Sequence, residues 1–479
     1  MTAGLWTAYE AAAATGGALC ARGGDPERWI AEEWAAADVS IDTRSIKPGE
    51  MFVALRDARD GHEFIRNAFE AGAAAALVAK APADAPDGAP LLVVPDTLEG
   101  LRDLARAARR RNFGKRVAVT GSVGKTGAKE MLRALLGTAG SVHAADKSFN
   151  NQWGVPLTLA RMPMASDFGV FEIGMNHAGE ITPLARLVKP HAAIVTTIAP
   201  AHLEFFSSVE DIAEAKAEIF LGLNSGGTAV LPFDNPHYSL LERRAKAAGA
   251  ARILSFGEGA GADFRLTERR PADADAAIFA TFRGEKVEYR LGAPGAHQAL
   301  NSLAALAAAY AVDVDPVDAA ASLAGLAPTE GRGARTKIAL KDGGEALLID
   351  ESYNANPASM TAALALLGAA VPARGGRRIA VLGEMLELGE TAEALHAGLS
   401  EALVASRADR LYVAGALMNA LWDAAPAAMR AARAPSASGL LDAVMADLRD
   451  GDVIMVKGSN ASKVSEIARA LKERARQDD

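Results

Sequence analysis

The chain has 479 residues, of which half are apolar and 23% are charged, a globular composition that excludes a disordered or fibrous protein. The net charge of −8 gives no electrostatic case for nucleic-acid binding, and no apolar run approaches the roughly 20 residues of a membrane span. The single cysteine, Cys20, excludes an internal disulfide, and the absence of a basic start typical of signal peptides leads us to expect a cytoplasmic protein.

A chain of this length exceeds what one hydrophobic core supports, so we expect three domains of the α/β class. A loop rich in Pro, Ala and Asp follows residue 80 and ends the first segment. After it, "LLVVPD" predicts a short strand, and 97–112 predicts a helix with apolar residues at helical spacing. We place the domain boundaries after residues 112 and 327.

The second and third segments alternate apolar strand runs with amphipathic helices, which predicts parallel sheets covered on both faces. The expected strands of the second segment are "RVAVTG", "FGVFEIG", "AAIVTTIA", "TAVLPFD" and "RILSFG". Those of the third are "EALLIDES", "RRIAVLGEM", "RLYVAGA" and "DVIMVKGS". Polar residues follow several of these runs, and ligands bind beyond the carboxyl ends of strands in open α/β sheets.

The stretch "RVAVTGSVGKTGAKEM" contains a glycine loop between an expected strand and an expected helix. Backbone N–H groups at a helix N-terminus favour a phosphate, Lys125 can reach the outer phosphates, and Thr126 can bind Mg²⁺. A standard P-loop has four residues between its glycines, whereas this loop has only Ser122 and Val123. The short spacing argues against an ordinary GTPase or kinase loop.

Three further polar residues follow in the second segment. Glu172 ends a strand and is a candidate ligand for the Mg²⁺ of the glycine loop. His202 is a candidate ligand for a second metal, although a single histidine is more often structural. Lys216 lies on an alanine-rich helix, where a lysine is normally solvated, and the residues alone give it no special role.

The third segment contains a polar turn, "IDESYNANPASM", at the end of an expected strand. Asp350, Tyr353, Asn354 and Asn356 suit a ribose hydroxyl or an adenine edge. Arg332 lies between two glycines at the expected hinge. It is either an arginine finger for a γ-phosphate or a solvated residue of a flexible linker, and we give these two alternatives equal weight.

Together these residues resemble the Mur ligases, an ATP-dependent family that extends the peptide of the bacterial cell-wall precursor. The abbreviated loop "TGSVGKT" is that family's form of the P-loop. "VLGEMLELGE", "DESYNANPAS" and "KSFNNQWGVPLTL" are similar to the member that adds D-alanyl-D-alanine to UDP-N-acetylmuramoyl-tripeptide. The stretch 40–65 resembles the family's uridine-nucleotide domain, and "HQALNSLAALAAA" its nucleotide-contacting helix. The resemblance covers essentially the whole chain.

The resemblance implies a UDP-sugar domain, a central P-loop ATP domain and a C-terminal Rossmann-like ligase domain, in a protein that we expect to be a monomer. The ATP contacts that it implies are Gly121, Ser122, Val123, Gly124, Lys125, Thr126, Asn301, Arg332, Asp350, Tyr353 and Asn354. The contacts to the UDP-sugar peptide are Asp42, Arg44, Ser45, Asn150 and Asn151. Thr126 and Glu172 would hold one Mg²⁺, and His202 with a carbamylated Lys216 a second. The implied catalytic residues are Lys125, Lys216, His202 and Arg332.

The implied reaction is amide-bond formation through an acyl phosphate, shielded from water when the third domain closes over the second. One departure from the family pattern is Gly127, which stands where many relatives have Thr or Ser. The alternatives are a sister Mur ligase or a folylpolyglutamate synthetase, a P-loop small-molecule kinase, and a nucleotide-binding protein without activity. The strings "SYNANP" and "GEMLELGE" argue against the first, and the presence of Glu172, His202 and Lys216 argues against the last.

Overall fold

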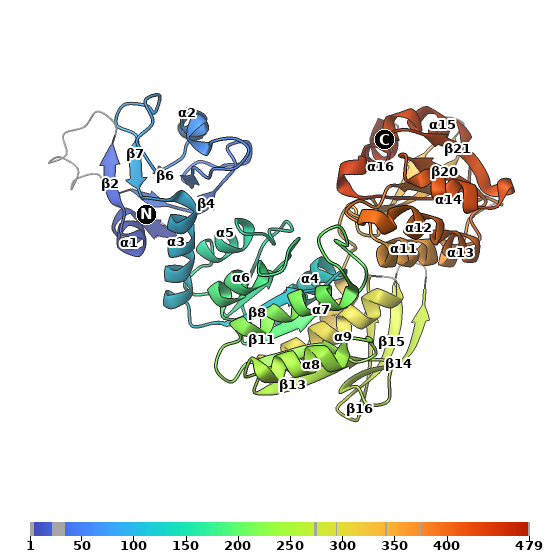
Figure 1. Cartoon of the computed structure of the whole chain (residues 1–479), viewed down its shortest axis with the longest axis horizontal. Coiled ribbons are helices and arrows are strands. Elements are labelled where there is room, and N and C mark those ends of the chain that lie inside the picture. The colour runs from blue at the N-terminus through green and yellow to red at the C-terminus, as the bar shows by residue number, and fades with distance from the viewer. Residues whose placement is uncertain are drawn as a thin grey trace.

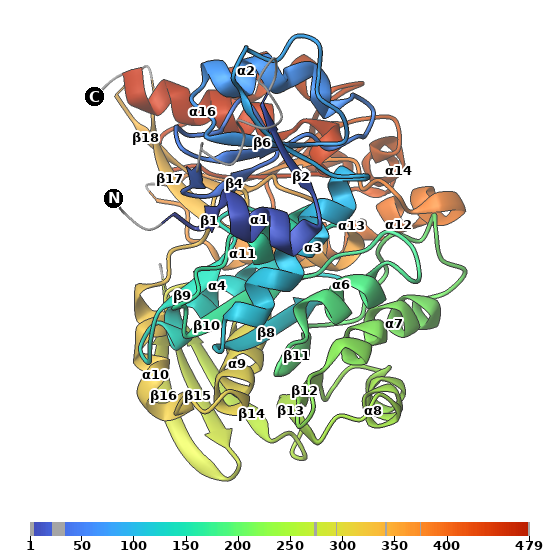
Figure 2. The same ribbon diagram turned by 90° about the vertical axis from the view of Figure 1, so that its left-hand side faces the viewer.

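The computed structural model describes residues 4–21, 34–272, 275–293, 295–340, 343–373 and 375–477. The chain forms three α/β regions, which we call the first region (to residue 112), the central region (113–327) and the third region (from 328). Figure 1 shows the first and third regions on either side of the central one, and Figure 2 shows both above the central sheet. None of the helices in these described ranges has the length and apolar character needed to cross a bilayer.

The first region is built on a five-stranded sheet in the order β2-β7-β6-β5-β4. Among the described strands of this sheet, only β2 runs antiparallel to its neighbour. The elements are β1 (Trp6–Thr7), α1 (Ala8–Thr15), β2 (Ala18–Ala21), β3 (Ala35–Ala36), β4 (Val39–Ser40), β5 (Met51–Val53), α2 (Ile65–Glu70), β6 (Ala75–Val78), β7 (Pro90–Val93) and α3 (Thr97–Arg111). We expected the first segment to end near residue 80. It extends further, because β7 lies inside this sheet.

The long helix α3 fastens the first region to the central region. Asp96 caps its start by accepting hydrogen bonds from two backbone amides, both at 2.8 Å. At its end the Asn112 side chain donates to the backbone oxygens of Pro163, Met164 and Ser166 at 3.2, 3.1 and 2.8 Å. One buried amide therefore holds three carbonyls of a central-region loop.

The central region contains a nine-stranded sheet in the order β16-β15-β14-β13-β12-β11-β8-β10-β9. Its elements are β8 (Lys115–Thr120), α4 (Lys125–Leu136), β9 (Val142–Ala144), α5 (Gly154–Ala160), β10 (Phe168–Glu172), α6 (Ile181–Val188), β11 (Ala192–Val195), α7 (Val209–Ala217), β12 (Thr228–Pro232), α8 (Tyr238–Ala247), β13 (Arg252–Gly257), β14 (Phe264–Pro271), β15 (Ala276–Phe282), β16 (Glu285–Leu291), α9 (Ala296–Ala311) and α10 (Pro316–Ala320). The five predicted strands are present as β8, β10, β11, β12 and β13, and they pair in parallel.

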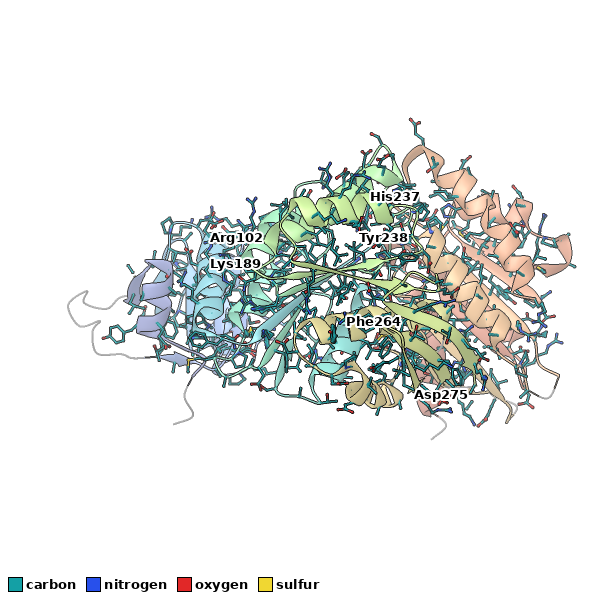
Figure 3. The ribbon with its side chains drawn as sticks, turned by 90° about the horizontal axis from the view of Figure 1, so that it is seen from below. Arg102, Lys189, His237, Tyr238, Phe264 and Asp275 are labelled. Atoms are coloured by element: carbon teal, nitrogen blue, oxygen red, sulfur yellow. The ribbon has the colours of Figure 1, made fainter. Side chains whose placement is uncertain are left out.

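The alternation of strands and helices predicted a wholly parallel sheet, and this prediction is wrong for one edge of the sheet. Strands β14, β15 and β16 extend its edge as antiparallel hairpins. In β15, buried residues alternate strictly with partly exposed ones, which is typical of a half-buried antiparallel strand. In the view from below, Tyr238 and Phe264 mark α8 and β14 (Figure 3), and these two residues belong to the cores on opposite faces of the sheet.

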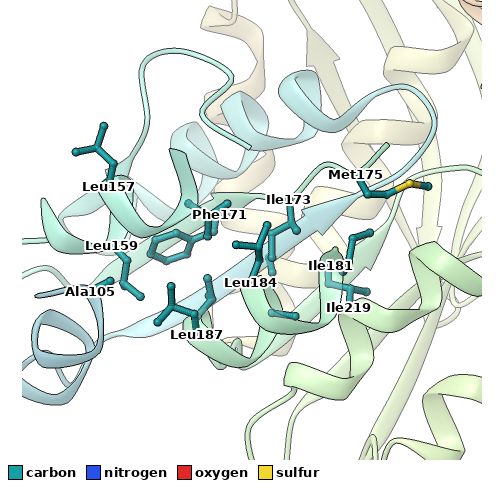
Figure 4. Packing of buried hydrophobic residues seen from close by; sticks show 14 of the residues in the cluster. Ala105, Leu157, Leu159, Phe171, Ile173, Met175, Ile181, Leu184, Leu187 and Ile219 are labelled. Carbon is teal, nitrogen blue, oxygen red and sulfur yellow. The ribbon is translucent and has the colours of Figure 1, made fainter. Parts of the chain in front are cut away.

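Successive residues of the central strands point to opposite faces, so each strand contributes to two cores. Phe171 packs on the face covered by α5 and α6, together with Leu184 and Leu187 (Figure 4), whereas its neighbour Val170 packs on the face covered by α4 and α9. Both faces are therefore closed to water. The loops at the strand ends are left to carry polar chemistry.

The third region has a six-stranded sheet in the order β17-β18-β22-β19-β20-β21, parallel except for β17. The elements are β17 (Ala334–Ala339), β18 (Glu345–Glu351), α11 (Pro357–Ala369), β19 (Arg378–Gly383), α12 (Ala392–Ala397), α13 (Leu399–Ala405), β20 (Arg410–Ala414), α14 (Met418–Ala424), β21 (Arg430–Ala434), α15 (Leu441–Asp447), β22 (Val453–Lys457) and α16 (Ser465–Gln477). All four predicted strands are present, with helices on both faces.

Candidate active site

A cavity of about 950 Å³ lies between the central and third regions. It is bordered by the loops that follow β8, β10 and β11 of the central sheet and β18, β19 and β22 of the third. Both sheets therefore present the carboxyl ends of parallel strands to one space. This is the position at which open α/β sheets bind ligands.

The glycine loop forms one wall of this cavity. The backbone of Gly121 has φ 150° and that of Gly124 has φ 89°, both favoured by glycine. A Cβ on Gly121 would lie 1.9 Å from Thr196 Oγ1, so the close approach of β11 also requires glycine. Helix α4 begins directly after Gly124, and its first N–H groups offer the anion site predicted from the sequence.

Lys125 is folded back onto the loop, where its ammonium donates to the Gly121 carbonyl at 2.7 Å. Burial lowers the pKa of Lys125, while the carboxylate of Glu172 acts in the opposite direction. Among the described residues this carbonyl is the one hydrogen-bond partner of the partly buried ammonium, which is therefore well suited to an incoming anion. The lysine is thus held in place for a phosphate group.

Thr126 and Glu172 are brought together, as the sequence predicted. Thr126 Oγ1 donates to Glu172 Oε2 at 2.9 Å, and the Asn150 side chain donates to Glu172 Oε1 at 2.8 Å. Within the described residues, no three His, Cys, Asp or Glu side chains converge as a metal cluster. A hydroxyl and one carboxylate nevertheless fit Mg²⁺, which takes one or two protein carboxylates and completes its shell with phosphate oxygens and water.

Lys216 lies on α7 and is only 1% exposed, so it is not the solvated lysine that its sequence context suggested. Burial holds the pKa of its amine well below 10.5, and the nearby positive charge of Lys125 lowers it further. Lys216 does not line the cavity, whereas His202, its predicted partner at the second metal, does.

The third region supplies Arg332, Tyr353 and Asn354 to the same cavity. The Arg332 guanidinium stacks on the Tyr353 ring at 4.0 Å from its centroid and donates to Ser148 Oγ at 3.4 Å. Ser148 in turn lies 3.1 Å from Thr126 Oγ1. The arginine therefore lies against Ser148 and Thr126 of the central region and is not a freely solvated linker residue.

Asp350, also predicted as a nucleotide contact, is turned away from the cavity. One of its oxygens accepts from Lys472 at 2.6 Å, and the other accepts from the Ser352 hydroxyl at 2.6 Å. Asn356 acts as the N-cap of α11 and accepts from the Ser359 amide at 2.9 Å. The polar turn thus places Tyr353, Asn354 and Asn356 at the cavity, where the Asn356 amide also lies 3.5 Å from the Ser122 carbonyl of the glycine loop.

The residues predicted for the UDP-sugar peptide divide between two places. Asn150 lines the cavity, whereas Asn151 accepts a hydrogen bond from the amide of Gly154, the first residue of α5, at 2.9 Å. Asp42, Arg44 and Ser45 lie in the first region, where the Asp42 carboxylate accepts from the Arg44 side chain at 2.7 and 2.9 Å. These three first-region residues do not border the cavity.

Several cavity residues were missed by sequence reasoning. Lys457, at the end of β22, donates to the Asn354 carbonyl at 2.8 Å and lies 3.5 Å from the Glu351 carboxylate. Burial raises the pKa of Glu351 and lowers that of Lys457. Gln298 and Glu387 also border the cavity. The position of Lys457 directly after the strand run "DVIMV" was the available signal.

Comparisons with known proteins agree with this geometry. Residues 119–309 match the Mur ligase middle domain, and residues 335–460 match the Mur ligase glutamate ligase domain. Two relatives named UDP-N-acetylmuramoyl-tripeptide--D-alanyl-D-alanine ligase come from Bacillus subtilis and Escherichia coli. They are 34% and 36% identical, covering 92% and 91% of this chain and 94% and 93% of their own lengths.

Solved structures give the same result. MurF from Acinetobacter baumannii superimposes with a TM-score of 0.82 at 28% identity, over 98% of this chain and 99% of that one. MurF from Thermotoga maritima in complex with ADP has a TM-score of 0.76 at 26% identity, over 92% and 98% of the two chains. The phosphate loop, the acidic strand end and the two facing sheets thus occur in a chain that belongs to the Mur ligase family.

Proposed function

We propose that this protein is an ATP-dependent ligase that joins D-alanyl-D-alanine to UDP-N-acetylmuramoyl-tripeptide. The observation that carries the proposal is the shared cavity, in which the glycine loop of the central region faces Arg332, Tyr353 and Asn354 of the third. The names of the relatives in Bacillus subtilis and Escherichia coli support the choice of substrates. Substrates of this kind are made in the cytoplasm, where we expect the protein to act.

ATP would bind with its phosphates on the glycine loop and its adenosine between the two sheets. The N–H groups at the start of α4 and the Lys125 ammonium meet the phosphates. Asn301, on α9, borders the cavity next to Gly124, and the flat pair of Arg332 and Tyr353 offers a stacking surface. The ADP in the Thermotoga maritima structure supports the use of this nucleotide.

Thr126 and Glu172 would hold Mg²⁺, which offsets the negative charge that gathers when a phosphoryl group approaches a carboxylate. For a second Mg²⁺ the candidates are His202 and Lys216. Burial that lowers the pKa of an amine favours its neutral, nucleophilic form. In that form Lys216 can attack the carbon of CO₂, forming an N–C bond and releasing one proton, which turns the neutral amine into an anionic carbamate.

The reaction follows from this arrangement in two steps. A terminal carboxylate oxygen of the tripeptide attacks the γ-phosphorus of ATP, so that an O–P bond forms and ADP leaves. The dipeptide amine then attacks the acyl carbon, the C–O bond to phosphate breaks, and the nitrogen loses a proton. Lys125 and Arg332 stabilise the transferred charge, and the enclosure between two regions excludes water from the reactive acyl phosphate.

The first region would bind the uridine nucleotide, with Asp42, Arg44 and Ser45 as candidate contacts. Asp42 and Arg44 form an ion pair in which the arginine is exposed and the aspartate partly buried. Because these residues lie outside the cavity, the tripeptide would have to reach from the first region to the central one. Its terminal carboxylate would then arrive beside Asn150 and the phosphate loop.

The test combines the protein with ATP, Mg²⁺, bicarbonate, D-alanyl-D-alanine and UDP-N-acetylmuramoyl-tripeptide carrying either diaminopimelate or lysine. We expect ADP, phosphate and pentapeptide in equal amounts, with all three products dependent on the dipeptide. ADP release that does not depend on the dipeptide would contradict the proposal. A stable phosphorylated product would favour the small-molecule kinase instead.

A further inference from the structure

The loop after β19 in the third region contacts the loop after β11 in the central region at two points. His202 Nδ1 lies 2.6 Å from Glu387 Oε2, and the Glu204 amide donates to the Glu387 carbonyl at 3.1 Å. His202 and Glu387 are 185 positions apart in the sequence. The contact therefore joins two regions at the rim of the cavity, which both His202 and Glu387 border.

Both partners hold an uncommon backbone conformation. The φ of His202 is 58° and that of Glu387 is 62°, in the left-handed region that residues with a side chain rarely adopt. Such conformations persist where the surrounding structure fixes them, and they gather at functional sites. Here each one directs a side chain towards the other region.

The Glu387 loop is braced from within the third region. The Leu386 amide donates to Ser459 Oγ at 3.0 Å, and the Met385 amide donates to His396 Nε2 at 2.9 Å. Met385 and Leu388 are buried on either side. The carboxylate of Glu387 is thus presented by a fixed loop, although its side chain is 44% exposed.

The chemistry of the pair determines which ring nitrogen carries the proton. A carboxylate accepts hydrogen bonds, and Glu387 Oε2 lies within hydrogen-bonding distance of His202 Nδ1, at 2.6 Å. Nδ1 must then carry a hydrogen. This leaves Nε2, which no described residue contacts by a hydrogen bond, as the nitrogen available to a metal.

We propose that Glu387 is a positioning residue that sets the tautomer and orientation of His202, so that the second metal site is complete only when the third region contacts the central region. The inference rests on the proposed function, in which His202 binds the second Mg²⁺. Metal-binding histidines commonly donate their other N–H to a carboxylate, and loss of such a partner costs 10- to 100-fold in metal affinity. In this chain the carboxylate would come from the region that moves.

The first experiment reads the tautomer without metal. Protein labelled with ¹⁵N-histidine has eight histidines, and comparison with His202→Gln assigns the His202 signals. We expect an Nδ1-protonated ring in the parent protein and in the control Glu390→Ala, which removes an exposed acid of the same loop. In Glu387→Ala the ring should shift to the Nε2-protonated form or a mixture, and in Glu387→Gln, whose amide oxygen can still accept, it should stay closer to the parent.

The second experiment titrates Mn²⁺, detected by electron paramagnetic resonance, with a non-hydrolysable ATP analogue and bicarbonate present. We expect two Mn²⁺ in the parent and a 10- to 100-fold loss of affinity for the weaker one in Glu387→Ala, with the stronger one unchanged. An unchanged tautomer together with two unchanged Mn²⁺ affinities in Glu387→Ala, or an equal loss in Glu390→Ala, overturns the inference alone. A parent protein that binds a single Mn²⁺ contradicts the second metal site of the proposed function and this inference with it.

Discussion

Gly124 and Asn301 approach each other so closely that a Cβ on Gly124 would lie 2.6 Å from the Asn301 side-chain oxygen. The glycine belongs to the phosphate loop, directly before α4, and the asparagine belongs to α9. Helices α4 and α9 cover the same face of the central sheet. Two candidate nucleotide contacts are therefore packed against each other before any nucleotide binds. This packing makes the loop sensitive to a single methyl group.

We expect Gly124→Ala to weaken ADP binding by at least tenfold, because the methyl group must displace Asn301 and also strains a backbone with φ 89°. The matched control is Gly226→Ala, since Gly226 has φ 79° and no heavy atom within 4 Å of the added Cβ. It should lose about 1 kcal/mol of stability and keep its ADP affinity. Isothermal titration with ADP and thermal unfolding measure both quantities. Equal ADP affinities in the two variants would show that the contact does not matter.

Lys216→Ala should abolish turnover, because it removes the amine that we expect to carry a carboxylate. Short carboxylic acids such as acetate should restore part of the activity by occupying the vacated space. Phosphate release in the presence and absence of acetate measures the effect, with Lys216→Met as a control that fills the space and cannot be rescued. Full activity in Lys216→Ala would rule out the anionic-lysine hypothesis.

Asp350→Asn should affect folding more than nucleotide binding. Asp350 is 2% exposed, and its carboxylate accepts from Lys472 and Ser352 inside the third region. Removing the charge leaves the Lys472 ammonium with the exposed Glu330 as its remaining ion-pair partner, at a cost on the order of 2 kcal/mol. Urea unfolding and ADP affinity distinguish the two roles. If ADP affinity falls tenfold while stability is unchanged, the sequence-based assignment of Asp350 to the nucleotide is right.

Acid should destabilise the central region through His191. Burial lowers the pKa of this imidazole to about 4, and its Nδ1 accepts a hydrogen bond from the Arg116 amide at 3.0 Å. The native state prefers the neutral ring, so its contribution is complete above the unfolded pKa of about 6.5 and is lost as the pH falls towards 4. We expect a loss of about 1–3 kcal/mol across this interval, since the ring is only partly buried.

His191→Gln should make the unfolding free energy less dependent on pH between 6.5 and 4. His237→Gln, which changes a histidine whose side chain makes no capping hydrogen bond to α8, is the control and should leave the pH dependence as it is. Urea unfolding at a series of pH values provides the measurement. Parallel curves for His191→Gln and the parent would mean that other groups cause the acid loss.

The sequence predicted those features that depend on local pattern. The apolar runs before Gly121, Glu172 and Asp350 are strands, because strands covered on both faces must be apolar throughout. The antiparallel strands β14 to β16 were not predicted, since half-buried strands alternate and carry a weaker signal. The shift of β7 into the first sheet was also missed, because pairing with β2 depends on contacts distant in the sequence.

In the candidate site, too, local pattern predicted some features and missed those that depend on distant contacts. Thr126 and Glu172 were predicted together and lie 2.9 Å apart, since the ends of neighbouring parallel strands must meet. Asp350 occupies the same kind of position, but Lys472 on the C-terminal helix α16 holds it away from the cavity. Glu387 lies in the string "VLGEMLELGE", but its contact with His202 was not predicted, because that partner lies in another region of the chain. Contacts between regions are decided by tertiary packing and cannot be deduced from periodicity.

The hydrogen bonds from Asn112 to three carbonyls have a consequence for how the protein binds its long substrate. With α3 anchored in this way, we expect the first and central regions to move as one rigid body, and only the third region to move relative to them. The growing peptide would then stay stationary between its sugar-nucleotide anchor and the phosphate loop throughout the cycle. Movement of the third region alone would then control when the smaller reactants bind and leave.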